Sequence, residues 1–101
     1  MTRPGLLTSL EAKAKILVIL DEGIVILTHH CRSESMRKRD VDMNDVRLAL
    51  LNGEIRRTPE WSDEYQNWKY RVEGFDILGD ELTCITVIID AELTALIVTV
   101  F

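Results

Sequence analysis

The sequence is poor in the residues that build covalent or metal-held scaffolds. It contains two cysteines, Cys31 and Cys84, which are too few for a disulfide framework and lack the C-x-x-C spacing of a zinc site. Cys84 lies in an apolar stretch and is expected to be a small buried hydrophobic residue. We expect both thiols to be free, which indicates a reducing compartment and a cytoplasmic protein.

Long apolar runs and reaction-specific motifs are also missing. No run reaches the ~18–20 residues that cross a bilayer, and the run 16–20 is too short for the hydrophobic core of a signal peptide. We therefore expect no membrane partner. The sequence has no glycine-rich phosphate loop, nucleophile elbow, metal-spaced cluster or paired catalytic carboxylates. It thus predicts no metal and no cofactor, and no motif specifies a reaction.

Positive charge is scarce overall and unevenly spread. The net charge of −5 argues against general nucleic-acid affinity, and DNA is not an expected partner. Residues 29–71 carry nine Lys and Arg, whereas residues 72–101 carry none and have six acids. Those acids lie in expected turns and strand ends, where they would keep the protein soluble and protect sheet edges.

The helices are indicated by their caps. At 101 residues with 47% hydrophobic content, the chain 1–101 is expected to form one domain. Thr8 and Glu11 have the spacing of a capping box before a helix over about 9–21. A polar stretch, 29–39, predicts a short surface helix with Cys31 and Ser35 facing inward. Asp42 is a good N-cap for a third helix over about 43–52.

The strands are indicated by β-branched and aromatic residues at 24–28, 54–58, 68–75, 81–89 and 93–101, with a polar loop at 61–67. Residues 82–89 and 95–101 are apolar at nearly every position, so they should be central antiparallel neighbours with the first helix packed against them. The fold class is α+β, with helices on one face of a small antiparallel sheet in the order α-β-α-α-β-β-β-β.

Three groups of residues could carry chemistry. His29 and His30 are adjacent and point to different sides, so they are unsuited to bind one metal ion. One would be exposed and the other a capping or partly buried group, or else one is a general acid or base. The basic run 37–39 with Arg32 is either a solvated helix face or a phosphate-binding patch, in which Arg32 and Arg39 share a helix face.

The third group lies on the strand 68–75. Alternation places Lys69, Arg71 and Glu73 on one face and Trp68 and Tyr70 on the other. The first three are a routine polar exterior, or a pocket if the second helix covers them. The two aromatics fit a core better than a base-stacking surface.

The sequence resembles a family of small bacterial proteins of unknown function that is placed beside the RelE/ParE-type toxins of toxin–antitoxin systems. The likeness covers roughly residues 24–101, and its C-terminal part is the more specific. It is carried by Thr28-His29-His30-Cys31-Arg32, Met36, Arg39, Val41, Asp45-Val46, Leu51-Asn52-Gly53-Glu54-Ile55, 68–74, 79–83 and 96–101.

The resemblance implies helices packed on an antiparallel sheet and a RelE-like, toxin-like endoribonuclease without a metal ion. In that interpretation His30 is the base, Lys69 and Arg71 stabilise the transition state, and Arg32 and Arg39 bind RNA phosphates. The implied partners are RNA and an antitoxin or other protein. The alternative is a non-catalytic protein-binding module on the same scaffold, because fold does not fix function.

Overall fold

The helices begin and end where local hydrogen bonds cap them. The computed structural model describes residues 3–101. Helix α1 (Ser9–Glu22) starts at Thr8, whose side chain accepts from the Glu11 backbone while the Glu11 carboxylate accepts from Thr8 N. Helix α3 (Met43–Asn52) starts at Asp42 with the same reciprocal pattern through Asp45. Both predicted helices are confirmed, because a capping box satisfies backbone donors that a helix start leaves open.

The second predicted helix is present but is not α-helical throughout. It contains a π-helical turn, η1 (Cys31–Ser35), followed by the α2 turn (Met36–Arg39). Cys31 and Ser35 face inward as expected, and Met36 joins them. The π turn places an extra residue in the helix, so the spacing from Arg32 to Arg39 is not that of a regular α-helix. The shared face of these two residues stays a prediction.

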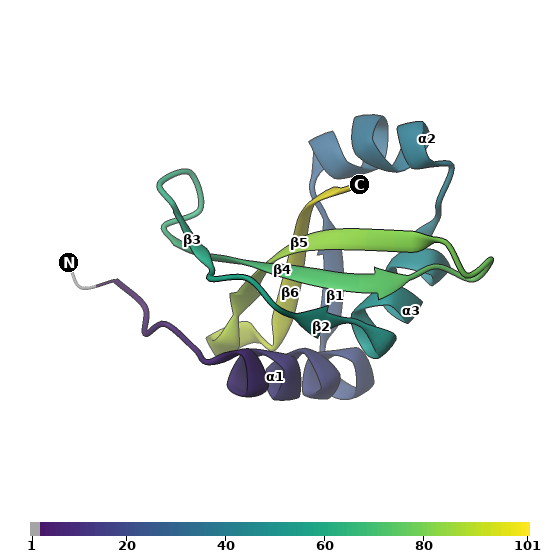
Figure 1. Ribbon diagram of the computed structural model, residues 1–101. Coiled ribbons are helices and arrows are strands. Elements are labelled where there is room, and N and C mark those ends of the chain that lie inside the picture. Colours follow the sequence, from purple (N-terminus) through teal and green to yellow (C-terminus); the bar gives the residue numbers. More distant parts are fainter. Residues whose placement is uncertain (1–2) are drawn as a thin grey trace.

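The sheet has six strands, β1 (Ile24–Leu27), β2 (Glu54–Ile55), β3 (Glu60–Ser62), β4 (Asn67–Phe75), β5 (Glu81–Ile89) and β6 (Thr94–Val100). Their order is β1-β6-β5-β4-β2, with β3 also paired to β4 (Figure 1). A short 3-10 turn, η2 (Asp90–Glu92), joins β5 to β6. The central antiparallel pairing of β5 and β6 is confirmed, as is the α+β class.

The sheet is mixed rather than purely antiparallel. Strand β1 pairs in parallel with β6, with Ile24 opposite Thr94 and Leu27 opposite Ile97. A parallel pair needs a long crossover, and nearly the whole chain from the second helix to β5 provides it. Because that connection is so long, no local turn signal in the sequence could have shown this pairing.

The segment expected as a strand over 54–58 and a loop over 61–67 is organised differently. Strand β2 ends at Ile55, and β3 pairs antiparallel with β4, with Trp61 opposite Trp68. The two indole rings pack edge to face, with centroids 5.3 Å apart. This aromatic contact stabilises a strand where the surrounding polar residues suggested a loop.

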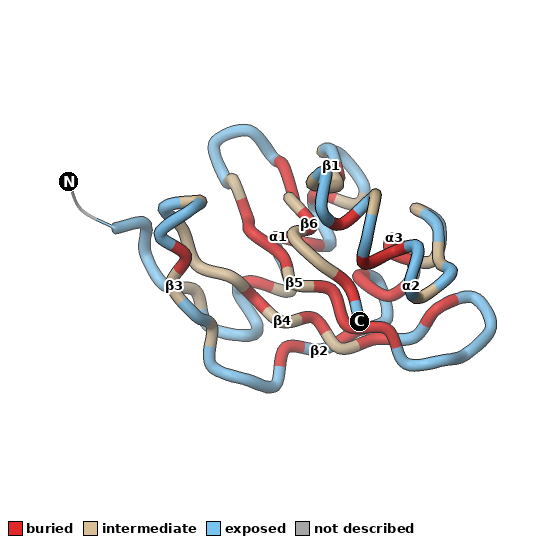
Figure 2. Tube along the Cα trace, turned by 90° about the horizontal axis from the view of Figure 1, so that it is seen from above, coloured by how far each residue is buried: buried red, intermediate tan, exposed pale blue. Residues whose placement is uncertain are grey.

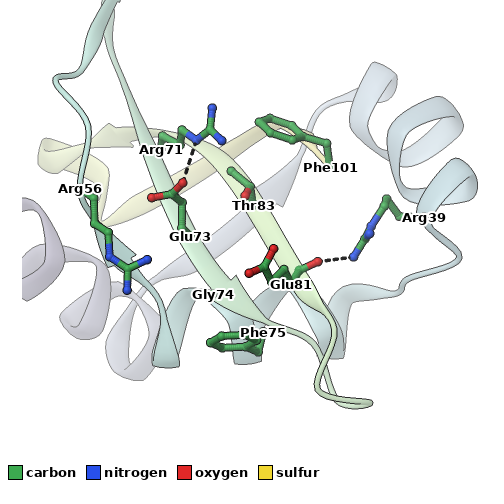
Figure 3. A pocket seen from close by; sticks show the side chains of 9 residues that line it. All are labelled: Arg39, Arg56, Arg71, Glu73, Gly74, Phe75, Glu81, Thr83 and Phe101. Atoms are coloured by element: carbon green, nitrogen blue, oxygen red, sulfur yellow. Dashed lines mark hydrogen bonds and ion pairs between the residues drawn. The ribbon is translucent and has the colours of Figure 1, made fainter.

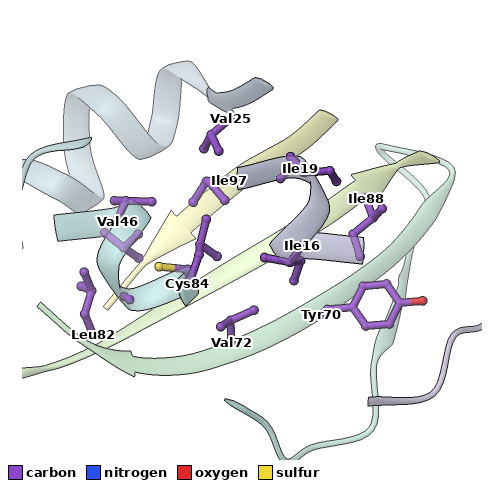
Figure 4. Packing of buried hydrophobic residues seen from close by; sticks show 14 of the residues in the cluster. Ile16, Ile19, Val25, Val46, Tyr70, Val72, Leu82, Cys84, Ile88 and Ile97 are labelled. Carbon is purple, nitrogen blue, oxygen red and sulfur yellow. The ribbon is translucent and has the colours of Figure 1, made fainter. Parts of the chain in front are cut away.

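The core lies between the helices and one face of the sheet. Ile16 and Ile19 from α1 and Val46 from α3 pack against Val72 and Cys84 on the strands (Figure 4). Buried residues follow β4, β5 and β6, while loop tips are exposed (Figure 2). Both cysteines are free and buried, as predicted. No helix within residues 3–101 is long and apolar enough to cross a membrane.

Candidate functional site

The face of the sheet opposite α1 and α3 carries two hollows that meet at Arg71. The first, of about 310 Å³, is lined by residues from α2, the segment after β2, β4, β5 and the C-terminal end (Figure 3): Arg39, Arg56, Arg71, Glu73, Gly74, Phe75, Glu81, Thr83 and Phe101. The second, of about 220 Å³, is lined by Arg57, Thr58, Glu60, Lys69, Arg71, Ile85, Val98 and Thr99. We call the two together the open-face groove.

The alternation along β4 explains why its charged residues line this groove. Tyr70 and Val72 are buried in the core, so Lys69, Arg71 and Glu73 point to the opposite face. All three charged side chains are half-buried rather than free in solvent. The strand therefore supplies two cations and one carboxylate at fixed two-residue spacings, ~6.5–7 Å apart.

Arg71 is the least exposed arginine of the groove, at 28%. Its Cζ atom lies 4.9 Å from the centroid of the Phe101 ring, and its Nε lies 3.3 Å from Glu73 Oε1. The ion pair orients the guanidinium, although its geometry falls short of a hydrogen bond. Within residues 3–101 no side-chain nitrogen of Arg71 donates a hydrogen bond, so the terminal fork is available to an anion.

Arg39 approaches the groove from the end of α2. Its Nη2 donates to the carbonyl oxygen of Glu81 and lies 3.9 Å from the buried Asp76 carboxylate. These contacts tie α2 to the β4–β5 hairpin (Figure 3). The Arg39 Nε is buried and has no hydrogen-bond partner among residues 3–101, which leaves a donor to satisfy at the edge of the groove.

Two further arginines form the rim. Arg56 Nη2 lies 3.1 Å from Glu54 Oε2, and Arg57 Nε lies 3.9 Å from Glu73 Oε1. Both side chains are more than 60% exposed, at 65% and 63%. Exposed pairs of this kind contribute little to stability, so both side chains can turn toward a bound anion at low cost.

The groove brings together some of the predicted site residues and not others. Arg39, Lys69 and Arg71 line it. His30 and Arg32 line neither hollow, and both are exposed. The His30 Nδ1 lies 2.9 Å from Glu34 Oε2, one turn along the second helix. The roles assigned to these two residues stay predictions.

Sequence reasoning missed Arg56, Arg57 and Phe101. The Arg56-Arg57 doublet is visible in the sequence, but residues 54–58 were interpreted as a strand of ordinary polarity. Its proximity to β4 comes from the β2–β4 pairing, in which Glu54 lies opposite Glu73. The available signal was a doublet of bases close to Pro59, where the expected strand had to end.

The polar groups of the groove suit an anion rather than a cation. Five side chains are cationic (Arg39, Arg56, Arg57, Lys69 and Arg71) against three carboxylates (Glu60, Glu73 and Glu81). Guanidinium groups offer only donors, in a fork that matches phosphate or carboxylate. Across residues 3–101 no three His, Cys, Asp or Glu side chains gather as metal ligands would.

Comparison with known proteins gives one family. Residues 27–101 match the model of a family described as "Domain of unknown function (DUF4258)". No curated protein and no solved structure matches the chain. The matched region begins at the end of β1 and includes every residue that lines the open-face groove.

Proposed function

Since the chain belongs to the DUF4258 family, whose function is unknown, we propose from the open-face groove that it binds single-stranded RNA and cleaves it in the manner of RelE/ParE-type toxins. The observation that carries this proposal is the gathering of five cations in one groove of a chain whose net charge is −5. A basic surface on a protein whose net charge is negative favours a polyanionic ligand. An RNA substrate would place the activity in the cytoplasm.

The shape and aromatic content of the groove favour a single strand. Phe75 and Phe101 line the first hollow and are 49% and 48% exposed. Exposed aromatic rings beside cations are the usual platform for unpaired bases, which stack while the backbone follows the positive charge. A duplex would keep its bases away from both rings.

The proposed chemistry needs no metal ion. A base removes the proton from a ribose 2′-hydroxyl, and the 2′-oxygen attacks the adjacent phosphorus. The bond from phosphorus to the 5′-oxygen breaks, which leaves a 2′,3′-cyclic phosphate and a 5′-hydroxyl that takes up a proton. Lys69 and Arg71 offset the charge that develops on the phosphoryl oxygens, while Arg39 holds a flanking phosphate. Arg32, which lines neither hollow, would bind a phosphate further along the strand.

Two groups are candidates for the base. His30 is the one predicted from the sequence, and it would have to leave Glu34 to reach the groove. Glu81 lines the first hollow, and its carboxylate has no ion-pair partner among residues 3–101. General-base catalysis requires that the base lie within hydrogen-bond reach of the hydroxyl. Substitution of each residue in turn tests which of the two acts as the base.

The experiment combines binding and cleavage with purified protein. Fluorescently labelled single-stranded RNA is titrated with the wild type, Arg71→Gln, Lys69→Ala and the control Lys38→Ala, which changes an exposed base of α2 outside the groove. We expect Arg71→Gln to weaken binding about 10-fold or more, in line with the loss of a charged hydrogen-bonding group, and Lys38→Ala to change it little.

The same samples, together with His30→Ala and Glu81→Gln, are then assayed for binding and for products ending in a 2′,3′-cyclic phosphate. Loss of product with retained binding in His30→Ala or Glu81→Gln would identify the base. Growth arrest on expression of the wild type in a bacterial host, relieved by Lys69→Ala, would support a toxin. RNA binding that is absent, or equal in wild type and Arg71→Gln, would contradict the proposal.

A protein-binding module is the second candidate, because an apolar hollow of about 410 Å³ lies between α1 and α3. Leu17 and Leu51 in its lining are 40% and 55% exposed. An antitoxin or other protein partner could cover these side chains. Harmless expression and no RNA binding, together with loss of a partner on Leu51→Lys, would favour this function.

A further inference from the structure

Strand β1 is an unprotected edge of the sheet. It pairs with β6 on one side, and among residues 3–101 no strand pairs with its other side. From Gly23 to Thr28 it carries no charged residue and no proline. Natural edge strands are usually blocked by such residues, by a bulge or by a covering element, because their open backbone groups invite pairing.

The backbone hydrogen bonds show which groups remain open. Ile24 N donates to Leu93 O at 3.0 Å, and Thr28 N donates to Ile97 O at 3.0 Å. Alternate residues of a strand direct their N–H and C=O groups to opposite sides. Val25 and Leu27 therefore direct theirs away from β6, as a matched set of two donors and two acceptors.

We infer that a second copy of this chain pairs antiparallel with β1, about a two-fold axis at Ile26. In that register Val25 of one copy lies opposite Leu27 of the other, and each pair exchanges two hydrogen bonds, so all four open residues are satisfied. The strand is thus self-complementary, which a symmetric interface requires. The two six-stranded sheets join into one of twelve strands.

The side chains fit the same arrangement. Ile24 and Ile26 are 59% and 45% exposed. The two Ile26 residues would form the non-hydrogen-bonded pair on the axis, where side chains come closest in an antiparallel ladder. Leu93, 39% exposed, lies beside Ile24, whose backbone N donates to the Leu93 carbonyl oxygen.

A second copy is the occupant that the charges favour. Two edges without charge meet with no repulsion, although each chain has a net charge of −5. A strongly charged partner would find no complementary group on residues 23–28. The interface uses neither hollow of the groove, so it stands independently of the proposed RNA cleavage.

The symmetry has a consequence for the groove. An axis normal to a continuous sheet keeps both open faces on the same side. The two copies of β4 would be separated by seven strand spacings, ~34 Å before twist is included. Because strand twist of about 20–25° per step accumulates over these spacings, the dimer would carry both basic grooves on one continuous sheet surface but turned away from each other.

The first test measures mass in solution. Sedimentation equilibrium over a dilution series compares the wild type with Ile26→Lys, and with Leu10→Lys as a control at an α1 position that is 84% exposed. We expect a dimer for the wild type and Leu10→Lys, and a monomer with an unchanged circular dichroism spectrum for Ile26→Lys. A wild type that is monomeric throughout, or an Ile26→Lys variant that still dimerises, would overturn the inference.

The second test determines the register in which the two copies of β1 pair. A cysteine on the axis faces its own symmetry mate, so Ile26→Cys should form a disulfide-linked dimer on mild oxidation. Ile24→Cys should not, because Ile24 would face Thr28 of the other copy. The native thiols of Cys31 and Cys84 are buried and give a low background. Equal cross-linking of both variants, or none in Ile26→Cys, would refute the proposed pairing.

Discussion

Lys13 shows how one side chain joins two helices. From α1 its Nζ donates to the carbonyl oxygens of Leu50 and Leu51 at 2.8 Å and of Gly53 at 2.5 Å. These carbonyls lie at the end of α3, where no further helical turn can pair them. Removal from water lowers the pKa of Lys13, and the charge of the nearby Glu54 carboxylate opposes that effect by favouring the charged form.

Replacement of Lys13 by methionine keeps the apolar stem and removes the donors. We expect the free energy of unfolding to fall by about 1.5–3 kcal/mol, the range for hydrogen bonds to a charged group. Urea unfolding followed by circular dichroism measures the loss. Lys38→Met, at an exposed position, is the matched control, and equal stability of the two variants would show that Lys13 does not hold α3.

At the scale of elements, α3 is positioned by contacts at its two ends as well as by its apolar face. Near its start, Asp45 accepts from Asp42 N and from Ile77 N, both at 3.0 Å, which links the helix to the β4–β5 hairpin. Along its length, Val46, Ala49 and Leu50 are buried against the sheet. The same hairpin receives Arg39, so α3 and α2 both fix the groove's outer end.

The Asp45 contacts predict a pH dependence. Hydrogen bonds from the Asp42 and Ile77 backbones lower the pKa of Asp45 below its ordinary value. A carboxyl with a depressed folded pKa adds stability that is full above its unfolded pKa and is lost as pH falls through the folded value. Below pH ~4, urea midpoints should therefore drop more steeply for the wild type than for Asp45→Asn. Parallel slopes would contradict this.

Gly74 marks the closest approach of α3 to β4. A Cβ atom there would meet the carbonyl oxygen of Ala49, and it would lie 2.6 Å from the Asn52 Oδ1. Gly74→Ala should therefore push the helix from the strand and cost on the order of 1–3 kcal/mol, as overpacking does. Gly5→Ala, with nothing within 4 Å of its added Cβ, is the control. Thermal unfolding of both variants decides the matter, and similar midpoints would exclude a tight contact.

At the scale of the whole molecule, charge is segregated between surfaces. Residues 72–101 add six acids and no base, yet β4 and the segment after β2 direct their bases to one face. A groove of this kind can bind a polyanion although the protein as a whole is acidic, because nearby charges outweigh those beyond the screening length of ~8–10 Å.

Salt dependence tests this segregation. Each phosphate neutralised in a single strand steepens the fall of log affinity with log salt by about 0.7. Lys69→Gln should therefore weaken RNA binding and make that slope shallower by about 0.7, the contribution of one phosphate contact. Lys38→Gln should leave the slope unchanged. Fluorescence anisotropy at a series of salt concentrations provides the slopes. A wild-type affinity that does not change with salt concentration would exclude phosphate binding in the groove.

The sequence by itself determined the features that depend on neighbours along the chain. Thr8 with Glu11 and Asp42 marked the helix starts, because a cap forms within three residues. The alternation around Tyr70 and Arg71 assigned the two faces of β4, because side chains of a strand must alternate. The apolar character of β5 and β6 put them at the sheet centre, because only buried strands are apolar on both faces.

Only the tertiary structure decided which distant residues meet. Arg39 and Glu81 are 42 residues apart, and Arg39 reaches the groove while His30, on the same helical segment, lines neither hollow. The parallel pairing of β1 with β6 likewise joins two segments that lie far apart in the sequence. Such contacts depend on how whole elements pack, because local hydrogen bonds and hydrophobic periodicity carry no information about which elements become neighbours.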